Sequence, residues 1–296
     1  MPGSVAEVAA GLAAQGYLAD EGLATSVFLC LTLHRPLLLE GEAGVGKTEL
    51  AKVVAAWTGG PLLRLQCYEG IDISQAVYEW DYARQLLHLR AAEAGGVTEE
   101  AEAEIYSERF LIRRPLLSAI DHQEGAPPVL LIDEVDRADD EFEAFLLEVL
   151  SDYTITIPEI GTLRAETPPV VILTSNRTRD VHDALKRRCL YHWVEHPGFE
   201  REVEIVRRRA PQAVETLARQ VAAAVAGLRE MHLYKPPGVA ETIDWTASLA
   251  ALGRTELDER SVELTLGTVL KYQEDQARVR EAGFTALVAG ALARAE

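Results

Sequence analysis

Apolar residues recur along the chain with two different spacings. Near the N-terminus they fall at helical spacing and predict two helices within residues 5–34. Farther on they form short continuous runs, which are typical of strands buried on both faces of a parallel sheet. Four such runs occur, at residues 36–40, 62–66, 127–134 and 168–176, and a fifth strand is expected after residue 189.

The pattern changes in the last third of the chain. Residues 199–296 carry Ala-, Leu-, Glu- and Arg-rich helical patterns, interrupted at residues 235–238 and 252–253, without a convincing strand. The sequence therefore predicts an α/β domain over residues 1–197, with a parallel sheet flanked by helices. A smaller all-helical lid domain is expected over residues 198–296.

Two segments interrupt the order of strands and helices in the first domain. The stretch between the second and third strands is too long for a simple crossover, so we expect an inserted helix within residues 68–100. Residues 152–158 and 161–166 predict a small hairpin before the fourth strand. The acidic stretch at 99–108 is most simply a solvated helical face.

Aromatic residues gather in the insertion, which leaves two interpretations open. They are Tyr68, Tyr78, Trp80 and Tyr82. Such side chains could hold a client protein, but we expect them to pack the insertion against the core.

Composition and charge narrow the class of protein. The chain of 296 residues is 48% hydrophobic and 26% charged, which is typical of a soluble globular protein, and it contains no apolar run long enough to span a membrane. Its net charge of −18 opposes binding to nucleic acid. The N-terminus lacks the basic start of a secretory signal, and three dispersed cysteines suggest no disulfide framework. These features predict a cytoplasmic protein.

The strongest motif is a glycine loop at residues 41–48, GEAGVGKT, between a predicted strand and a predicted helix. Backbone N–H groups of such a loop converge on phosphate oxygens, and the helix N-terminus adds partial positive charge. We expect Lys47 to reach the β- and γ-phosphates of ATP and Thr48 to bind Mg²⁺. The expected nucleotide-binding residues are Gly41, Glu42, Ala43, Gly44, Val45, Gly46, Lys47, Thr48 and Glu49.

Polar residues at the ends of two later strands supply candidate catalytic groups. The third strand ends in Asp133, expected to hold Mg²⁺, and Glu134, expected to orient and deprotonate the attacking water. The fourth strand ends near Asn176, whose amide could bind the water or the γ-phosphate, or else cap a helix. Together these residues favour hydrolysis over simple nucleotide storage.

A basic run, Lys186-Arg187-Arg188, ends the short helix before the fifth strand. Cations at a helix C-terminus usually complement the helix dipole. The alternative is an arginine finger acting on the γ-phosphate of a neighbouring subunit. A metal site at Cys189, His192 and His196 is not expected, because residues four apart on a strand lie about 13 Å from one another.

In this order, the glycine loop, LLIDEVDRADDEFEAFLLEVLSD, the hairpin, LTSNRT and LKRRC resemble the AAA+ ATPases, specifically their MoxR branch, over residues 20–200. Within that branch, RLQCYEGIDISQAVYEWDY and SNRTRDVHDALKRRCLYHWVEHP resemble the CoxD type. That type is associated with maturation of a molybdenum- and copper-containing carbon monoxide dehydrogenase.

The resemblance implies a P-loop fold in a homo-hexameric ring, with ATP and Mg²⁺ bound between neighbouring subunits. It implies that Asn176 is a sensor, that Arg188 or Arg187 is the finger, and that Arg260 is a second sensor. It also implies that Tyr17 and Leu18 line the adenine pocket.

The expected function is ATP hydrolysis coupled to remodelling of a protein client. The resemblance implies a metalloenzyme client undergoing cofactor insertion and a von Willebrand factor A domain protein as partner. Two alternatives stay open: a nucleotide-gated scaffold with negligible turnover, and an ATP-dependent nucleic-acid motor or loader.

Overall fold

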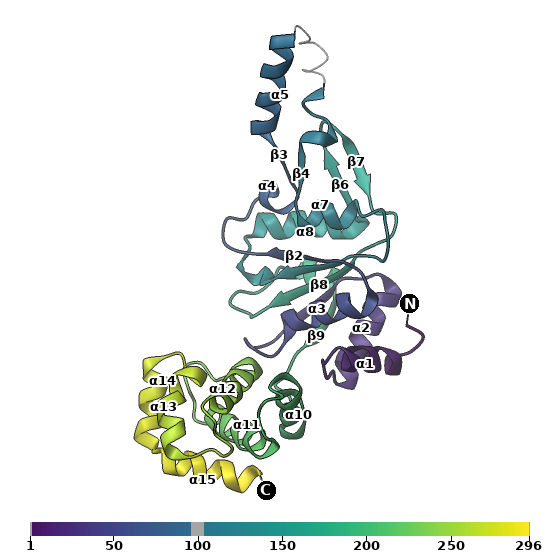
Figure 1. Cartoon of the computed structure of the whole chain (residues 1–296). Helices are drawn as coiled ribbons and strands as arrows, with labels where there is room; N and C mark the ends of the chain where they lie inside the picture. The colour runs from purple at the N-terminus through teal and green to yellow at the C-terminus, as the bar shows by residue number, and fades with distance from the viewer. Residues whose placement is uncertain (1, 96–103, 296) are drawn as a thin grey trace. The chain divides into compact units, whose positions relative to one another are not determined.

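The structure, a computed structural model, describes residues 2–95 and 104–295 (Figure 1). Contacts divide these residues into two compact units. The first comprises the described residues within 1–8, 21–40 and 48–193, and the second those within 9–20, 41–47 and 194–296. The glycine loop therefore groups with the C-terminal helices.

The first unit is built on a parallel sheet of five strands in the order β2-β5-β8-β1-β9. The strands are β1 (Leu37–Glu40), β2 (Leu62–Gln66), β5 (Val129–Asp133), β8 (Val170–Ser175) and β9 (Leu190–Trp193). Every residue of β1 and β5 is buried, as the apolar runs predict. The expected parallel sheet and P-loop fold class are confirmed.

Helices flank this sheet. In the first unit these helices are α2 (Glu21–Leu33), α3 (Lys47–Thr58), α7 (Pro115–Ile120), α8 (Asp140–Asp152) and α9 (Asp183–Arg188). The first helix of the chain, α1 (Val5–Ala14), is divided between the two units. Leu116 and Leu117 of α7, with Leu146 of α8, join Leu130 and Ile132 in one buried apolar cluster. The two N-terminal helices were predicted by their apolar spacing.

The insertion after β2 contains more than the single helix expected. Its elements are α4 (Ile73–Ala76), β3 (Tyr78–Trp80), α5 (Tyr82–Gly95), the 3₁₀ helix η1 (Glu108–Phe110) and β4 (Leu111–Arg113). The strands β3 and β4 pair antiparallel, a small sheet that the sequence pattern did not reveal. Figure 1 shows α5 extending beyond it. Part of the acidic stretch lies outside the described residues.

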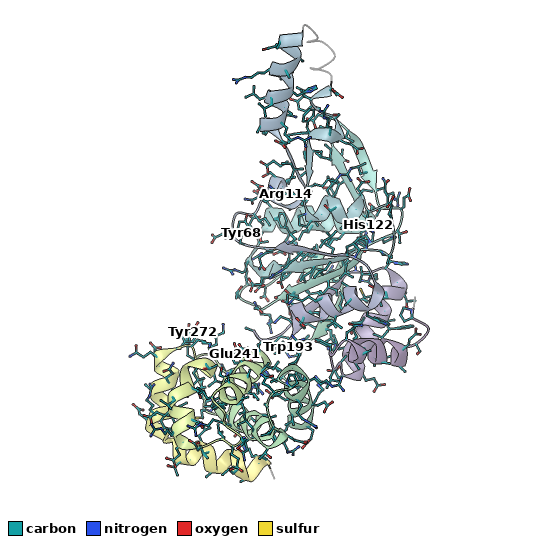
Figure 2. The ribbon with its side chains drawn as sticks, viewed as in Figure 1. Tyr68, Arg114, His122, Trp193, Glu241 and Tyr272 are labelled. Carbon is teal, nitrogen blue, oxygen red and sulfur yellow. The ribbon has the colours of Figure 1, made fainter. Side chains whose placement is uncertain are left out.

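The aromatic residues of the insertion divide into two groups. Trp80 is buried in the core cluster, and Tyr78 packs against that cluster, as expected. Tyr68, labelled in Figure 2, and Tyr82 are 40% and 67% exposed, so the packing prediction was wrong for these two.

The predicted hairpin is present. Its strands β6 (Thr154–Ile157) and β7 (Gly161–Arg164) pair antiparallel. Tyr153, in the left-handed conformation with φ 52°, ends α8 and leads into β6. Its hydroxyl donates to the carbonyl of His34 over 2.9 Å.

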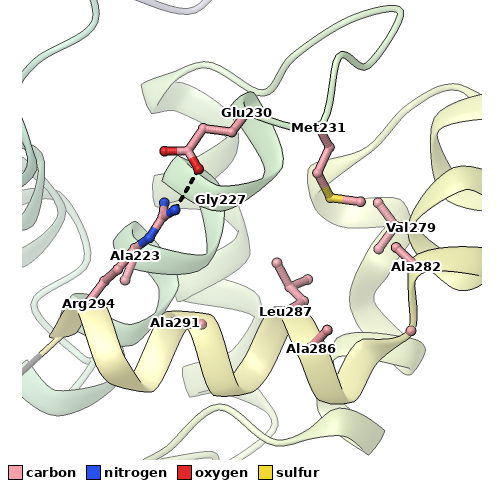
Figure 3. A pocket seen from close by; sticks show the side chains of 12 residues that line it. Ala223, Gly227, Glu230, Met231, Val279, Ala282, Ala286, Leu287, Ala291 and Arg294 are labelled. Atoms are coloured by element: carbon pink, nitrogen blue, oxygen red, sulfur yellow. Dashed lines mark hydrogen bonds and ion pairs between the residues drawn. The ribbon is translucent and has the colours of Figure 1, made fainter.

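The described residues after Val194 form helices joined by loops, without a strand. These helices are α10 (Phe199–Arg209), α11 (Glu215–Arg229), α12 (Val239–Ala251), α13 (Glu259–Val269), α14 (Gln273–Ala282) and α15 (Phe284–Ala295). Trp245 is fully buried, and its indole N–H donates to the hydroxyl of Thr265 over 2.7 Å. Small residues of α11 and α15 line a cavity of about 260 Å³, beside the Arg294–Glu230 ion pair (Figure 3).

None of the helices in residues 2–95 and 104–295 combines the length and the apolar character that a membrane crossing requires.

Candidate nucleotide site

The glycine loop joins β1 to α3, as the motif requires. Gly44 and Gly46 have φ angles of 80° and 99°, in the region that favours glycine. Lys47 is buried, and its ammonium donates to the carbonyls of Gly41 and Glu42 over 2.7 and 2.6 Å. A glycine loop followed by a helix N-terminus and a buried lysine has the donors that a polyphosphate requires.

The loop lies against the N-terminus of α12 within the second unit. The carbonyl of Gly44 accepts from the backbone N–H groups of Val239 and Ala240 over 3.1 and 3.3 Å. A Cβ placed on Gly238 would lie 2.7 Å from the carbonyl oxygen of Ala43. The carboxylate of Glu241, which is labelled in Figure 2, accepts the backbone N–H of Gly238 over 2.9 Å. Only a residue without a side chain fits at Gly238.

Tyr17 lies beside the glycine loop, and Arg260 lies on α13. A Cβ on Gly46 would meet the ring of Tyr17 at 3.6 Å, and the neighbouring Leu18 is half-buried. Arg260 is the second residue of α13, and its side chain is exposed. The glycine loop is contacted by α12, and the sequence pattern did not predict this contact.

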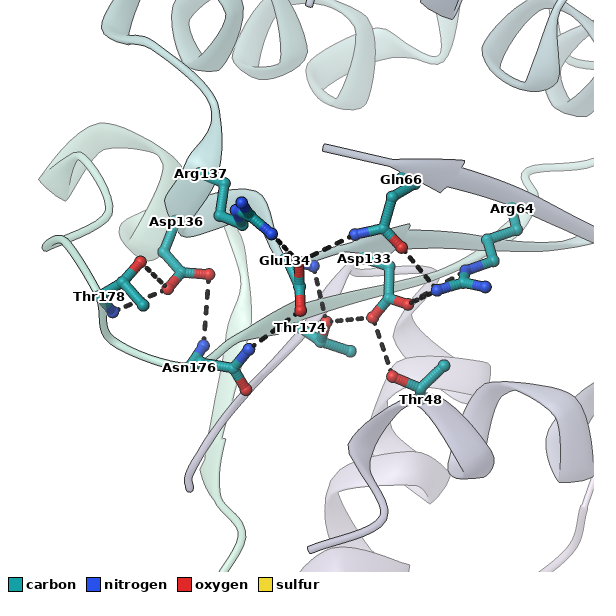
Figure 4. Close-up of polar contacts among 10 residues, drawn as sticks. All are labelled: Thr48, Arg64, Gln66, Asp133, Glu134, Asp136, Arg137, Thr174, Asn176 and Thr178. Atoms are coloured by element: carbon teal, nitrogen blue, oxygen red, sulfur yellow. Dashed lines mark hydrogen bonds and ion pairs between the residues drawn. The ribbon is translucent and has the colours of Figure 1, made fainter. Parts of the chain in front are cut away.

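Thr48 and Asp133 meet in the first unit. The hydroxyl of Thr48 donates to Asp133 Oδ1 over 2.9 Å, and that of Thr174 donates to the same oxygen over 2.6 Å (Figure 4). Asp133 is only 2% exposed. A hydroxyl beside a buried carboxylate is an oxygen-donor set of the kind Mg²⁺ takes, so the residues fit this ion.

Glu134 follows Asp133 in a strained conformation, with φ 55° and ψ 51°. Its backbone N–H donates to the hydroxyl of Thr174 over 2.9 Å. One carboxylate oxygen accepts the side-chain amide of Asn176 over 3.3 Å. The other accepts from Gln66 and Arg137 over 3.1 and 3.0 Å. The ends of β2, β5 and β8 thus bring their polar side chains together at one edge of the sheet.

Asp136 fixes the segment that carries Asn176. Its buried carboxylate accepts from the N–H of Asn176 over 3.2 Å and from the N–H and hydroxyl of Thr178 over 2.8 and 2.7 Å. Asn176 is not a helix cap. Asp136 stands two residues after Glu134, beyond the end of the strand, and its role was not predicted.

Arg64 and Gln66 were also missed. Both lie on β2, two residues apart and therefore on the same face. The Arg64 guanidinium donates to Asp133 Oδ2 through Nε and Nη2, over 3.1 and 2.5 Å, and Nη2 also donates to the Gln66 carbonyl over 2.5 Å. The signal for these two was alternation of polar residues within the apolar run of residues 62–66.

Arg187 and Arg188 are exposed at the end of α9. Arg188 donates to the carbonyl of Ser151 over 2.9 Å. The side chain of Arg35 donates to the carbonyls of both arginines, each over 3.1 Å. A guanidinium on these terminal carbonyls complements the helix end and fixes the position of the two arginines.

No group of three metal-ligating side chains occurs among the described residues. His192 Nδ1 lies 3.4 Å from the hydroxyl of Ser26, and His196 Nε2 lies 3.1 Å from Glu42 Oε2. Burial raises the pKa of the Cys189 thiol to about 12. Burial, with the nearby Asp133 carboxylate, likewise raises the pKa of Cys67 to about 12.

A family model described as AAA domain (dynein-related subfamily) matches residues 36–189. Among curated proteins, no sequence gives a significant match. Solved structures with a similar fold include a point mutant of RuvB from Thermotoga maritima, at TM-score 0.49 and 15% identity, covering 90% of this chain and 73% of that one. A Cytophaga hutchinsonii protein proposed to be an ATPase gives TM-score 0.48 at 15% identity, covering 97% of this chain and 93% of that one.

At these TM-scores the solved structures add nothing to the assignment, which rests on the family model. Its match spans more than half of the chain and contains β1, the glycine loop, Asp133, Glu134 and Asn176. The chain therefore belongs to the AAA domain family, in the dynein-related subfamily.

Proposed function

We propose that this protein hydrolyses ATP and uses the energy to remodel a protein client. The observation that carries the proposal is the pairing of Thr48 with buried Asp133, next to a strained Glu134 that accepts the amide of Asn176. A protein that only stores a nucleotide needs no carboxylate positioned in this way.

The residues divide the work of phosphoryl transfer among them. Lys47 and the amides of the glycine loop bind the phosphates, and Thr48 and Asp133 hold Mg²⁺. When bound, this ion neutralises charge on the phosphate oxygens. Glu134 accepts a proton from the attacking water, and Asn176 orients Glu134 and that water. Gln66 and Arg137 hold the Glu134 carboxylate in position.

The remaining site residues are assigned by family resemblance. AAA+ proteins commonly form hexameric rings, so Arg188, or Arg187, would complete the site of the neighbouring subunit as an arginine finger. Tyr17 and Leu18 would contact the adenine, and the proximity of Tyr17 to Gly46 supports this. The role of Arg260 as second sensor rests on resemblance alone.

The client would be a metalloenzyme receiving its cofactor, as in the CoxD type of the MoxR branch, with a von Willebrand factor A domain protein as partner in the cytoplasm. The exposed Tyr68 and Tyr82 in the insertion would be available for contact with the client. A pull-down with the Glu134→Gln variant in ATP would identify what binds. Recovery of no such enzyme or partner would contradict this assignment.

Hydrolysis is tested by comparing Glu134→Gln with wild type at saturating Mg·ATP. We expect phosphate release to fall about 100-fold or more, while ATP affinity is retained, because the base is lost and the phosphate ligands are not. The matched control is Glu141→Gln, an exposed glutamate in the first turn of α8. Equal phosphate release by Glu134→Gln and wild type would remove the base assignment and favour the nucleotide-gated scaffold.

A nucleic-acid motor is the less favoured alternative, because the net charge of −18 opposes phosphate contacts. Binding to DNA or RNA at about 0.15 M salt would reverse this preference.

A further inference from the structure

The side chain of Arg64 is hydrogen-bonded to the carboxylate of Asp133, which the proposed function assigns as a metal ligand. It reaches from the edge strand β2 to Asp133 Oδ2, with Nε and Nη2 at 3.1 and 2.5 Å (Figure 4). The carbonyl of Gln66 accepts from the same Nη2 and holds the guanidinium in place.

All of the Asp133 carboxylate is partnered in this arrangement. Oδ1 accepts two hydroxyl groups, and Oδ2 accepts the guanidinium. A divalent cation or its water shell needs lone pairs of the same oxygens and carries the same sign of charge as Arg64. The cation and the guanidinium therefore exclude each other at Oδ2.

The two partners of this ion pair differ in burial. The side chain of Asp133 is 3% exposed, whereas that of Arg64 is 51% exposed. Asp133 cannot leave, and a buried carboxylate needs a compensating charge. Arg64 can turn outward into water at little cost, because half-exposed guanidinium groups hydrate readily.

We propose that Arg64 is an internal counter-ion that competes with the divalent cation for Asp133, so that cation binding displaces Arg64 from the carboxylate. This rests on the proposed function in one respect, the assignment of Asp133 as the metal carboxylate. Arg64 thereby stabilises the metal-free site and sets how much cation is needed to load it.

The test uses Mn²⁺ as the probe and measures free Mn²⁺ by electron paramagnetic resonance, with and without saturating ADP. Arg64→Met removes the positive charge and the two N–H donors of the guanidinium but keeps an extended side chain. We expect it to bind Mn²⁺ about three- to tenfold more tightly than wild type in both conditions. Arg64→Lys keeps the positive charge without the paired donors, so its Mn²⁺ affinity should lie between those of wild type and Arg64→Met.

The matched control is Arg294→Met, which makes the same charge change at the exposed Arg294–Glu230 ion pair. It should bind Mn²⁺ as wild type does. An Arg64→Met affinity equal to or weaker than that of the control, with far-ultraviolet circular dichroism unchanged, would overturn the proposal.

Failure of the proposed function gives a different result. If wild type binds no ADP but Arg64→Met still binds Mn²⁺ more tightly without nucleotide, the competition stands and the nucleotide site does not. If ADP binds and the Mn²⁺ affinities do not differ, the competition at Asp133 is wrong and the nucleotide site stands.

Discussion

Buried carboxylates organise the candidate site at the scale of single residues. Asp133 accepts two hydroxyls and a guanidinium, and Asp136 accepts three donors from the segment after β8. Charges held away from water persist only where such donors are supplied. The positions of Thr174 and Asn176 are therefore determined by the carboxylates as much as by their own strand.

Replacing Asp136 with asparagine tests this directly. Asn has the same shape but puts an amide donor or an uncharged oxygen opposite the N–H groups of Asn176 and Thr178. We expect Asp136→Asn to lower the free energy of unfolding by about 1–3 kcal/mol in urea titration. Asp152→Asn, at the exposed last residue of α8, is the control. Equal unfolding midpoints in the two variants would contradict the structural role.

The three buried cysteines should be unreactive in the folded protein. Burial is the main cause that raises the pKa of Cys30, Cys67 and Cys189 to about 12, from an ordinary value of 9.0. Iodoacetamide at pH 8 should therefore modify none of them without denaturant and all three in urea, as measured by mass spectrometry. Rapid modification of any one in the native protein would contradict this.

The same thiols give stability a pH dependence with a definite sign. Because their folded pKa values lie above the unfolded value, their contribution is complete below about pH 9 and is lost as the pH rises toward 12. The urea midpoint should fall across that window, and replacing the three cysteines with alanine should reduce the fall. An unchanged fall in that variant would place its cause elsewhere.

At the scale of elements, the glycine loop contacts the N-terminus of α12, and this contact depends on two glycines. Gly44 takes a positive φ, and its carbonyl accepts two N–H groups from the first turn of α12. Gly238 has an ordinary φ of −85°, so what it requires is space and not conformational freedom. Two backbone hydrogen bonds and one close approach therefore link the glycine loop to the start of α12.

Gly238→Ala should weaken nucleotide binding. Its methyl group would lie 2.7 Å from the carbonyl oxygen of Ala43 and 2.9 Å from Gly44 Cα, which are both backbone atoms. We expect a loss of ADP affinity of about tenfold, measured with a fluorescent ADP analogue, because overpacking forces the loop to shift.

Gly198→Ala is the matched control for that variant. Gly198 also precedes a helix of the same unit, and a Cβ there meets no atom within 4 Å. Full ADP affinity in Gly238→Ala would contradict the prediction, because it would show that the glycine loop can shift without weakening nucleotide binding. If Gly238→Ala and Gly198→Ala lost ADP affinity equally, the cause would be the changed helix N-cap and not the contact with the glycine loop.

At the scale of the whole molecule, the proposed active assembly is a ring, in which an arginine finger from each subunit would complete the nucleotide site of the next. The net charge of −18 opposes contacts with the phosphates of nucleic acid. Arg35 and Ser151 hold the end of α9 and leave Arg187 and Arg188 exposed. An exposed arginine on a fixed helix end can act on a neighbouring subunit.

Mixing inactive subunits tests this sharing of sites. Arg188→Ala has no finger, and Lys47→Ala has no phosphate lysine. Each alone should have little activity, but a mixture pairs intact sites with intact fingers and should recover part of the phosphate release. Absence of recovery for both Arg188→Ala and Arg187→Ala, with assembly confirmed by light scattering, would contradict action between subunits.

The sequence alone determined the sheet, the helices around it and the order of the glycine loop, Asp133, Glu134 and Asn176. These features follow from local periodicity and from the rule that parallel strands end at a common edge. The β3–β4 pair was not predicted, because a strand of three residues is too short to show the alternation of apolar and polar residues that marks a strand. Only the tertiary structure brought Arg64 onto Asp133 and α12 onto the glycine loop, because contacts between residues 69 and nearly 200 positions apart leave no local pattern to read.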